Sequence, residues 1–591
     1  MSRATLKSRK QENKKTRISS IETKRHSLSH VLAQAVKNLY PKVKLGIGPA
    51  IENGFYYDFD NLKLAPEDLP KIQKEMQKII NQGQKFEKFE MSKAEAKKML
   101  KSEPYKLDLL KELKEKPSFY KNLDTNGNKT FVDMCSGPHI ESTKELAADS
   151  FKLNRLAGAY WRGDEKNKML TRIYGIAMEN KSELKKYLEM LVEAEKRDHR
   201  KIGAQQDLFS FHEEGPGFPF WHAKGWIIWN EIVKYWREVH RREGYTEVNT
   251  PIILSRTLWE KSGHWEHYKE NMYFTKIDEM DYAIKPMNCP GGVLVYKNSL
   301  HSYKEFPLKV AELGLVHRHE LSGVLHGLFR VRSLTQDDAH IYCLPDQIEE
   351  EVGRVIDLIQ EIYKVFGFKK VKIELSTRPD NRMGSDKIWD KAELALKKIL
   401  QGKKVKYQLN EGDGAFYGPK IDFHITDSLD RTWQCGTIQL DFAMPETLDI
   451  EYVDEQGKKK RPVMLHRTVL GSFERFIGIL IEHYAGAFPL WLSPVQITII
   501  PVGADHKNFS HKLADEFRKN DLRVEVEDTN ETVGNKIRKA EKMKIPYMLV
   551  IGDKEMQSED LNVRLRGEKA VKKMSKEKFV ERMREEVEQK K

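Results

Sequence analysis

This 591-residue chain has only four cysteines, and their spacing excludes a disulfide framework. Cys135, Cys289, Cys343 and Cys435 stand at wide, irregular intervals. Small secreted scaffolds depend on closely spaced cysteine pairs, so this chain does not belong to that class. We expect it to work in a reducing compartment, the cytoplasm.

Long apolar runs are also missing. No stretch reaches the roughly 18 uninterrupted apolar residues of a transmembrane helix, and the longest candidate, residues 476–492, is broken by Glu482 and His483. The first 25 residues are rich in Lys, Arg and Ser but contain no apolar core, which excludes a secretory signal. A transit peptide is the alternative for this segment, but we expect residues 1–22 to be a disordered basic tail, and we expect no membrane partner.

A third absence is the phosphate-binding pattern G-x-x-x-x-G-K-[ST], so any nucleotide site must use another device. Arginine is the candidate, because guanidinium groups bind phosphate bidentately. Arg318 lies in His-Arg-His-Glu, Arg330 and Arg332 follow after a loop, and Arg475 lies in Gly-Ser-Phe-Glu-Arg. Isolated strings of this kind are common as surface ion pairs, so their weight depends on order and context.

Basic residues are in excess. Lys and Arg number 102 against 89 Asp and Glu, a net charge of +13. A basic balance on a large protein favours polyanionic partners, RNA above all, although scattered lysines that only aid solubility remain the alternative. The length predicts about three to five domains.

After the tail, four regions differ in composition and hydrophobic pattern. Residues 23–178 read as one compact unit, and residues 179–204 as a linking helix with one apolar face among charges. Residues 205–490 mix helices with β-rich aromatic segments. Residues 491–591 alternate apolar strand-like runs with helices, which predicts a small α/β domain.

Two groups of histidine and cysteine residues are candidates for metal binding or catalysis. His26 and His30 lie four residues apart, and Asp133-Met-Cys135-Ser-Gly-Pro-His139 lies far along the same unit. These side chains could form a closed zinc site, could bind an ester and orient a water molecule, or could be unrelated core pairs; spacing does not decide.

The second group consists of Cys289, His340 and His466, which come from distant segments. Three such ligands suit a zinc ion that keeps one coordination position open. Their separation in the sequence makes this prediction weak without other information.

The motifs together resemble the threonyl-tRNA synthetases. The strings are HSLSH, FVDMCSGPH, AGAYWRGD, KPMNCPG, VHRHE, LHGLFRVRSLTQDDAHIY, EGDGAFYGPKIDF, QCGTIQLDF, VMLHRTVLGSFERFIGIL and IIPVGADH, in order from about residue 25 onward. The resemblance implies a multidomain α+β protein: an α+β editing domain, a class II catalytic core with an antiparallel sheet, and a C-terminal α/β anticodon-binding domain. Many bacterial relatives carry a small ubiquitin-like domain where this chain has only the basic tail.

The resemblance also implies roles for matching positions. Arg318 is expected on the ATP α-phosphate, Glu320 near adenine, and Arg330 and Arg475 on the far phosphates, with Mg²⁺ accompanying ATP. Pro251 would lie at a homodimer interface. The other predicted catalytic residues are Gln336, Asp338 and Lys420, and the predicted substrate-binding residues are Met287, Tyr417, Gln434, Gln439 and Ser472. The predicted ligands of one zinc ion per subunit are Cys289, His340 and His466. A metal-free editing pocket is predicted from His26, His30, Asp133, Cys135 and His139, and anticodon binding from Asn530, Arg538, Glu555 and Arg564.

The predicted function is therefore ligation of L-threonine to tRNA(Thr) with ATP, plus hydrolysis of mischarged seryl-tRNA(Thr). An open zinc position distinguishes threonine from valine by its hydroxyl, but serine differs by one methyl, worth only about 1–3 kcal/mol, so a second hydrolytic site is expected. The alternatives are an RNA-binding regulator without catalysis, an enzyme for another amino acid on the same scaffold, and a protein that only edits.

Overall fold

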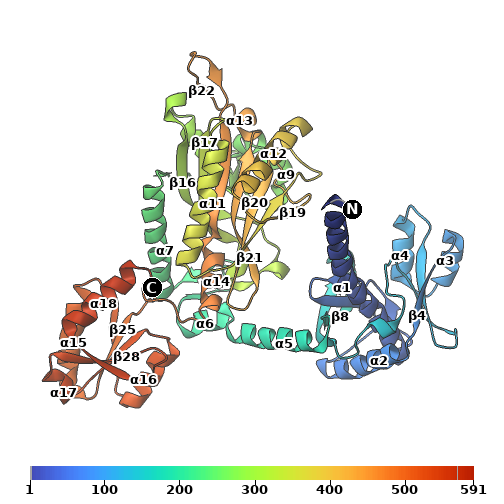
Figure 1. Cartoon of the computed structure of the whole chain (residues 1–591), viewed down its shortest axis with the longest axis horizontal. Helices are drawn as coiled ribbons and strands as arrows, with labels where there is room; N and C mark the ends of the chain where they lie inside the picture. Colours follow the sequence, from blue (N-terminus) through green and yellow to red (C-terminus); the bar gives the residue numbers. More distant parts are fainter. Residues whose placement is uncertain (1–2, 569) are drawn as a thin grey trace. The chain divides into compact units, whose positions relative to one another are not determined.

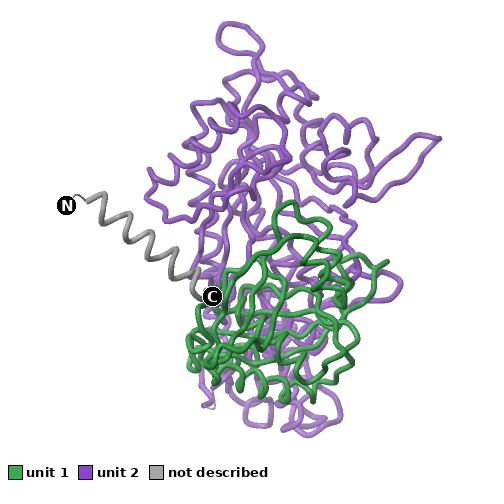
Figure 2. Tube along the Cα trace, turned by 90° about the vertical axis from the view of Figure 1, so that its right-hand side faces the viewer, with its two compact units in different colours: residues 1–192 green, residues 193–591 purple. Residues whose placement is uncertain are grey.

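The computed structural model describes residues 3–568 and 570–591, without the side chains of residues 3–20. The chain divides into two compact units, residues 1–192 (unit 1) and 193–591 (unit 2), drawn in separate colours in Figure 2. Residues 1–2 of the predicted disordered tail lie outside this description, as do the side chains of residues 3–20, and the disorder of the tail stays a prediction. No helix in the described part of the chain has both the length and the apolar character that a bilayer crossing requires.

The larger sheet of unit 1 is antiparallel and packs against two helices. Its strand order is β1-β3-β8-β7, with β2 beside β3. Helix α2 turns Leu69, Ile72, Met76 and Ile79 inward, because a spacing of three and four places them on one helical face. The bounds are α1 (Arg3–Leu39), β1 (Lys44–Leu45), β2 (Ala50–Ile51), β3 (Gly54–Asp60), α2 (Leu69–Asn81), β7 (Phe151–Tyr160) and β8 (Met169–Ala177).

A second, three-stranded antiparallel sheet of unit 1 carries the predicted editing residue Asp133. Its order is β4-β5-β6, and β6 leads directly into Cys135. The elements are β4 (Lys85–Glu90), α3 (Lys93–Met99), α4 (Pro104–Glu112), β5 (Ser118–Leu123) and β6 (Lys129–Met134).

Unit 2 is built on an eight-stranded sheet with the order β11-β16-β17-β24-β21-β20-β18-β19. Only the two edge pairs, β11 with β16 and β18 with β19, are parallel. The predicted antiparallel catalytic core is therefore confirmed. The strands are β11 (Thr246–Glu247), β16 (Leu308–His317), β17 (Ser333–Cys343), β18 (Val371–Ser376), β19 (Gln408–Asn410), β20 (Lys420–Thr426), β21 (Thr432–Asp441) and β24 (Val463–Ser472).

Helices cover one face of this sheet, and their apolar side chains form the main core of unit 2 (Figure 1). Ile341 on β17 and Leu465 on β24 are fully buried there beside Ile359 of α11 and Ile477 of α14. The helices are α7 (Ala223–Arg242), α11 (Ile348–Val365), α12 (Asp386–Gly402) and α14 (Phe473–His483).

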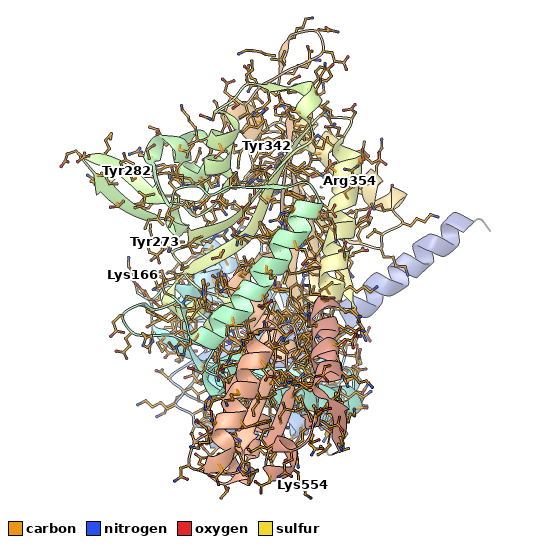
Figure 3. All side chains as sticks on the ribbon, turned by 90° about the vertical axis from the view of Figure 1, so that its left-hand side faces the viewer. Lys166, Tyr273, Tyr282, Tyr342, Arg354 and Lys554 are labelled. Carbon is orange, nitrogen blue, oxygen red and sulfur yellow. The ribbon has the colours of Figure 1, made fainter. Side chains whose placement is uncertain are left out.

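Small elements surround the other face. A three-stranded sheet, β12-β14-β13, forms a hairpin that Tyr273 and Tyr282 mark in Figure 3. The predicted linker, residues 179–204, contains two helices that meet near Asp198, whose side chain caps the second. The bounds are α5 (Lys181–Lys196), α6 (His199–Gln205), β12 (Ile253–Ser255), α8 (Arg256–Lys261), α9 (His264–His267), β13 (Tyr273–Ile277), β14 (Met280–Ile284) and α10 (Cys289–Tyr296).

The C-terminal part has the α/β form that the sequence predicts. Strands β26, β25 and β27 are parallel, and β28 and β29 complete the sheet in antiparallel fashion. The elements are β25 (Ile497–Pro501), α15 (Lys507–Arg518), β26 (Val524–Val526), α16 (Val533–Lys542), β27 (Tyr547–Ile551), α17 (Asp553–Met556), β28 (Asp560–Leu565), β29 (Val571–Ser575) and α18 (Lys576–Glu588).

Candidate functional sites

The central sheet of unit 2 places candidate residues in rows because side chains alternate between its two faces. His340, His466, Gln439 and Lys420 lie directly opposite one another across β17, β24, β21 and β20. The intervening residues, such as Ile341, point into the helix-covered core. A neighbouring row holds Asp338, Thr468, Thr437 and Asp422. One sheet face therefore collects polar groups from four strands.

Cys289, His340 and His466 meet on this face. One potential ligand atom from each lies within 4.8 Å of the others, and all three residues are buried. Cys289 begins helix α10, while the two histidines form a cross-strand pair with ring centroids 5.0 Å apart. The fold thus brings together the three ligands that sequence spacing alone supported only weakly.

The hydrogen bonds of the histidines show which atoms are available. His466 Nε2 lies 2.9 Å from Asp441 Oδ2, whereas His466 Nδ1 and His340 Nε2 are buried without a hydrogen-bond partner. Burial lowers the pKa of His340 well below its usual value and raises the pKa of Cys289 well above its own. A buttressing carboxylate on one ring nitrogen and an unpartnered second nitrogen are typical of a metal-ligating histidine.

A cavity of about 380 Å³ adjoins this cluster. Asp338 at its wall accepts a hydrogen bond from Asn288 Nδ2 at 3.2 Å, and burial raises the pKa of Asp338 to about 6. Tyr417 donates its hydroxyl hydrogen to Gln439. The predicted residues that line this cavity are Met287, Cys289, Arg318, Gln336, Asp338, Tyr417, Gln439 and His466.

A second cavity of about 480 Å³ is contiguous with the first, since both include Arg318 and Gln336 in their walls. Glu320 and Arg330 form an ion pair there at 2.8 Å, and Arg475 Nε is buried without a partner. Ser472 caps the start of α14 by accepting a hydrogen bond from the Arg475 N–H at 3.1 Å. The predicted residues on its walls are Arg318, Glu320, Arg330, Gln336, Gln434, Ser472 and Arg475.

Lys420 is not among the described residues that line either cavity. It lies on β20, where its ammonium group contacts Asp413 and Asp422, each at 3.0 Å. Asp422 also accepts hydrogen bonds from Gln434 and Thr437. Lys420 therefore belongs to the polar row but is occupied by two carboxylates, and its predicted catalytic role stays untested.

Sequence reasoning missed two residues of this site. Asp441 supports His466 from the end of β21, and its position within QCGTIQLDF was a signal in a motif already noted. His264 is fully buried, with Nε2 3.0 Å from Met287 Sδ and its ring beside Phe416. No motif marked His264, because only the folded chain brings α9 to the cavity.

In unit 1 the predicted editing residues form a compact cluster. Cys135 Sγ lies 3.3 Å from His26 Nε2 and 3.4 Å from His139 Nε2. His30 is buried, and its ring centroid lies 4.8 Å from that of His139. Burial lowers the pKa of all three histidines, that of His30 to about 4, and raises the pKa of Cys135. The imidazoles are therefore neutral at neutral pH.

The outward nitrogens of this cluster have protein partners. His26 Nδ1 lies 3.2 Å from the Pro138 carbonyl oxygen, so it carries the proton. Ser27 donates its hydroxyl hydrogen to the Thr23 carbonyl, so His139 Nδ1, at 3.1 Å, must donate to Ser27 Oγ. Both Nε2 atoms then present lone pairs to Cys135. The three ligand atoms are close enough to hold a metal ion, yet the thiol already contacts both nitrogens.

A cavity of about 670 Å³ opens on the cluster, and His26, His30, Asp133 and Cys135 lie on its walls. Lys106 on α4, which sequence reasoning missed, lines it too. Lys106 is buried and pairs with Asp133 at 2.8 Å, and Tyr57 donates its hydroxyl hydrogen to the same carboxylate. A cation beside the cluster could stabilise negative charge that develops during ester hydrolysis. Lys106 lies in none of the quoted motifs.

The predicted anticodon residues occupy the C-terminal sheet and its helices. Asn530 follows β26 and Glu555 lies on α17 after β27, so both stand at the carboxyl edge of the parallel strands. Asn562 donates to Glu555 at 2.6 Å, and Arg564 shares the sheet face of Asn562 two residues on. Arg538 is exposed on α16.

Three family models match the chain in separate regions. The "tRNA synthetase class II core domain (G, H, P, S and T)" matches residues 273–484, and the "Anticodon binding domain" matches residues 496–586. The "Threonyl and Alanyl tRNA synthetase second additional domain" matches residues 121–174, which include Asp133, Cys135 and His139.

Curated relatives agree over nearly the whole chain. A threonine--tRNA ligase of Carboxydothermus hydrogenoformans is 60% identical over 548 residues, covering 92% of this chain and 85% of the relative. One of Acetivibrio thermocellus is 58% identical, covering 96% and 88%. A solved structure of the RNA binding domain of threonyl-tRNA synthetase from Cryptosporidium parvum matches with a TM-score of 0.64 at 38% identity, covering 66% of this chain and 98% of that one.

Proposed function

The chain belongs to the threonine--tRNA ligases, class II synthetases that couple aminoacylation to editing, and we propose that Cys289, His340 and His466 hold a zinc ion that recognises threonine. The enzyme joins threonine to tRNA with ATP and hydrolyses mischarged tRNA in its editing domain. No observation favours the non-catalytic regulator, because the arginines and the candidate metal ligands are all present.

The observation that carries the zinc proposal is the pair of buried, unpartnered ring nitrogens, His340 Nε2 and His466 Nδ1, beside the Cys289 thiol. A buried polar atom without a partner costs about 1–3 kcal/mol, and a bound cation removes that cost. Asp441 orients His466 from the other side, as outer-sphere carboxylates do at zinc sites.

The cavity beside these ligands accounts for amino-acid selection. When bound, zinc supplies an open coordination position for the amino and hydroxyl groups of threonine. Asp338 lines the same cavity and can accept a hydrogen bond from the amino group, and Met287, Tyr417 and Gln439 would surround the side chain. Valine lacks the hydroxyl and is rejected, whereas serine loses one methyl and about 1–3 kcal/mol, too little for accuracy.

The contiguous cavity suits ATP. Arg318, shared by both cavities, is placed to contact the α-phosphate, while Arg330 and the unpartnered Arg475 at the start of α14 hold the outer phosphates, together with Mg²⁺. The threonine carboxylate attacks the α-phosphorus and pyrophosphate leaves. The terminal ribose hydroxyl of tRNA then attacks the adenylate carbonyl and releases AMP. The protein contributes positioning and charge stabilisation.

The cluster around Cys135 is proposed as a metal-free hydrolytic site for seryl-tRNA. Unlike His340 and His466, His26 and His139 have protein partners on both ring nitrogens. The neutral imidazoles can accept a proton from an attacking water molecule, and Lys106 lies on the same cavity wall to stabilise the oxyanion.

Three further assignments complete the proposal. Asn530, Arg538, Glu555 and Arg564 read the anticodon of tRNA(Thr). The enzyme acts as a homodimer in the cytoplasm. Pro251 is exposed beside the exposed apolar residues Ile252 and Ile253, which supports this surface as the contact between two copies.

Replacement of His340 by Ala tests the zinc proposal. The variant is expected to lose threonine-dependent ATP–pyrophosphate exchange and its one zinc per subunit, measured by elemental analysis. His301→Ala, a histidine of the same unit that lies outside both cavities, provides the control and is expected to keep both. Normal zinc content in the His340 variant would remove these ligands from consideration.

A further inference from the structure

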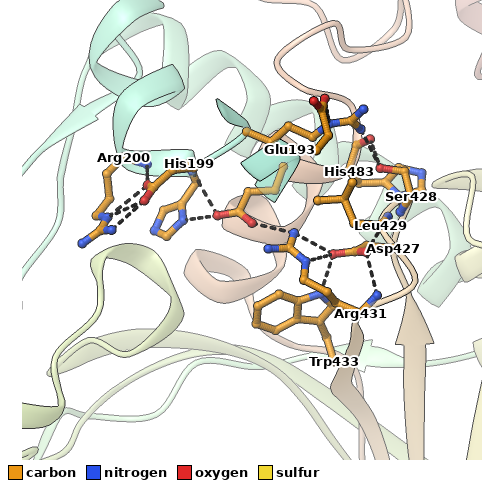
Figure 4. A network of polar contacts seen from close by, with 12 residues as sticks. Glu193, His199, Arg200, Asp427, Ser428, Leu429, Arg431, Trp433 and His483 are labelled. Carbon is orange, nitrogen blue, oxygen red and sulfur yellow. Dashed lines mark hydrogen bonds and ion pairs between the residues drawn. The ribbon is translucent and has the colours of Figure 1, made fainter. Parts of the chain in front are cut away.

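His199 stands at the centre of a buried polar network beside the ATP cavity (Figure 4). It is the first residue of α6 and is completely buried. Its backbone N–H donates to Glu482 Oε1 at 3.1 Å, and its Nδ1 lies 2.8 Å from the same oxygen. None of the sequence motifs marked this residue.

The hydrogen bonds fix the proton on the imidazole. The backbone N–H of Leu328 donates to His199 Nε2 at 3.0 Å, so that nitrogen carries a lone pair and Nδ1 carries the proton toward Glu482. Leu328 lies two residues before Arg330, the proposed phosphate ligand. His199 thus holds one end of the segment Gly327–Arg330 through a directional hydrogen bond.

Two more contacts restrain the same segment. The Phe329 ring, which lies on the wall of the ATP cavity, has its centroid 4.1 Å from that of His199 and 4.5 Å from that of Trp433. Gly327 has a positive φ of 48°, and a Cβ added there would lie 2.2 Å from His199 Nε2. The backbone at Gly327 therefore passes too close to the imidazole to allow any side chain.

The network behind His199 is itself rigid. Arg431 bridges Glu482 Oε2 at 2.6 Å and Asp427 at 2.7 Å. Asp427 also accepts from the Trp433 indole N–H at 2.9 Å, and Trp433 packs on Phe329. Asp427 and Glu482 are buried carboxylates that share the Arg431 guanidinium, and removing that partner would leave uncompensated charge.

A metal ion is the other use to which Asp198, His199 and Glu482 could be put, because their ligand atoms cluster. Every such atom already has a partner, however. Asp198 makes a bidentate contact with Arg200, and the two oxygens of Glu482 face His199 and Arg431. The cluster is consistent with a structural support rather than a cation site.

We propose that His199 is a positioning residue of the ATP site, which holds Gly327–Arg330 so that Arg330 and Phe329 meet the nucleotide. The proposal rests on the role assigned to Arg330 above. His199 touches neither substrate, so its effect passes through the Leu328 N–H and the Phe329 ring. The ATP-binding loop is thereby tied to the first residue of α6.

Steady-state ATP–pyrophosphate exchange with the full-length enzyme tests the proposal. His199→Ala is expected to lower kcat/KM for ATP by about 10- to 100-fold, the scale of a small misplacement of catalytic groups, while KM for threonine stays within about twofold. His199→Gln is expected to recover most of the loss, since its amide oxygen can accept from Leu328. His199→Asn, which reaches Glu482 but not Leu328, is expected to recover little.

Three companion variants make the result decisive. Ile202→Ala shortens a buried side chain on the same helix but leaves the His199 imidazole and its hydrogen bond to Leu328 in place, so it should lower the thermal transition but not kcat/KM for ATP. Gly327→Ala should reproduce the defect of His199→Ala even if the latter folds poorly. Arg330→Ala is the reference for the ATP site and should raise KM for ATP.

The inference is overturned if His199→Ala and Gly327→Ala keep normal ATP kinetics while Arg330→Ala does not. It is overturned equally if Ile202→Ala produces the same ATP-specific loss, or if Asn rescues as well as Gln does. Normal ATP kinetics in Arg330→Ala would instead contradict the proposed role of Arg330 itself.

Discussion

The histidines of these clusters differ in what their ring nitrogens contact, and these contacts separate their roles. His340 and His466 each keep one nitrogen without a protein partner, beside Cys289. His199 has both nitrogens occupied by protein groups, and His26 directs its second nitrogen at a thiol. The free nitrogens of His340 and His466 mark the proposed metal site. The occupied nitrogens of His199 mark a structural support, and the contact of His26 with the thiol marks the editing cluster.

Acidification is expected to destabilise unit 1 through its histidines. Burial lowers the folded pKa of His30 from 6.5 to about 4, so below pH 6.5 the unfolded chain takes up a proton that the folded chain refuses. Stability is therefore fully present above pH 6.5 and falls as pH drops toward 4. His30 alone should cost about 2 kcal/mol between pH 6.5 and pH 5.

Calorimetry of the wild type and of His30→Gln at pH 7 and pH 5 checks this expectation. The Gln variant has no titrating group at this position and should lose less stability on acidification. Equal losses in the two proteins would show that His30 takes up a proton in the folded state.

At the residue scale, the sequence predicted most groups that belong to motifs and few that act through tertiary neighbours. Cys289, His340 and His466 were found because their motifs resemble a known family. Lys106 and His264 were not, because a buried lysine or histidine has no sequence signature until folding supplies Asp133 or Met287 beside it.

Among the elements, β17 does the most to organise the active site. Its even-numbered residues Gln336 and Asp338 line the cavities and His340 joins the candidate metal cluster, whereas Ile341 and Cys343 join the core. A register shift between Gln336 and Asp338 leaves Asp337 to accept backbone hydrogen bonds from Val469, Leu470 and Gly471. The alternation can be read from the sequence, but the shift cannot, because it depends on which strand pairs with β17.

Arg523 of the C-terminal domain contacts both the connecting segment and the catalytic core. Its guanidinium donates to the carbonyl oxygens of Trp491 and Ser493 at 2.7 and 2.9 Å and contacts Glu231 of α7 at 2.7 Å. Burial lowers the pKa of Arg523. A partly buried arginine that satisfies carbonyl groups on the connecting segment holds the domain against α7.

Arg523→Ala is therefore expected to impair tRNA charging without affecting threonine activation. Loss of the buried contacts should cost about 3–5 kcal/mol of domain attachment and raise KM for tRNA. Aminoacylation and ATP–pyrophosphate exchange are measured side by side, with the exposed Arg518→Ala on α15 as control. A proportional fall in both activities would contradict this separation.

At the scale of the whole molecule, selection of the correct amino acid takes two steps: unit 2 charges the tRNA and unit 1 removes wrongly attached amino acids. The catalytic cavity can distinguish serine from threonine only by about 1–3 kcal/mol. Unit 1 must therefore hydrolyse the tRNA that has been charged with serine by mistake. The sequence predicted this division from the two groups of motifs and the resemblance that joins them. The sequence of the linker shows that the two units are joined, but it does not predict how they are oriented.

Cys135→Ala is expected to uncouple the two activities. The thiol lies between His26 and His139, so its loss should slow hydrolysis of seryl-tRNA(Thr) and let serine accumulate on tRNA, while threonine activation stays normal. Asn126→Ala, on an exposed turn of the same unit, should behave as the wild type. Wild-type accuracy in Cys135→Ala would place editing chemistry elsewhere in the cavity.

Recognition of threonine by a bound zinc ion is tested most directly by ATP–pyrophosphate exchange with threonine, serine and valine, before and after removal of zinc by a chelator. We expect strong exchange with threonine, weaker exchange with serine and none with valine, with all exchange lost on chelation and restored by added zinc. Exchange that persists after zinc is removed, or valine that reacts as well as serine, would contradict recognition by a metal at Cys289, His340 and His466.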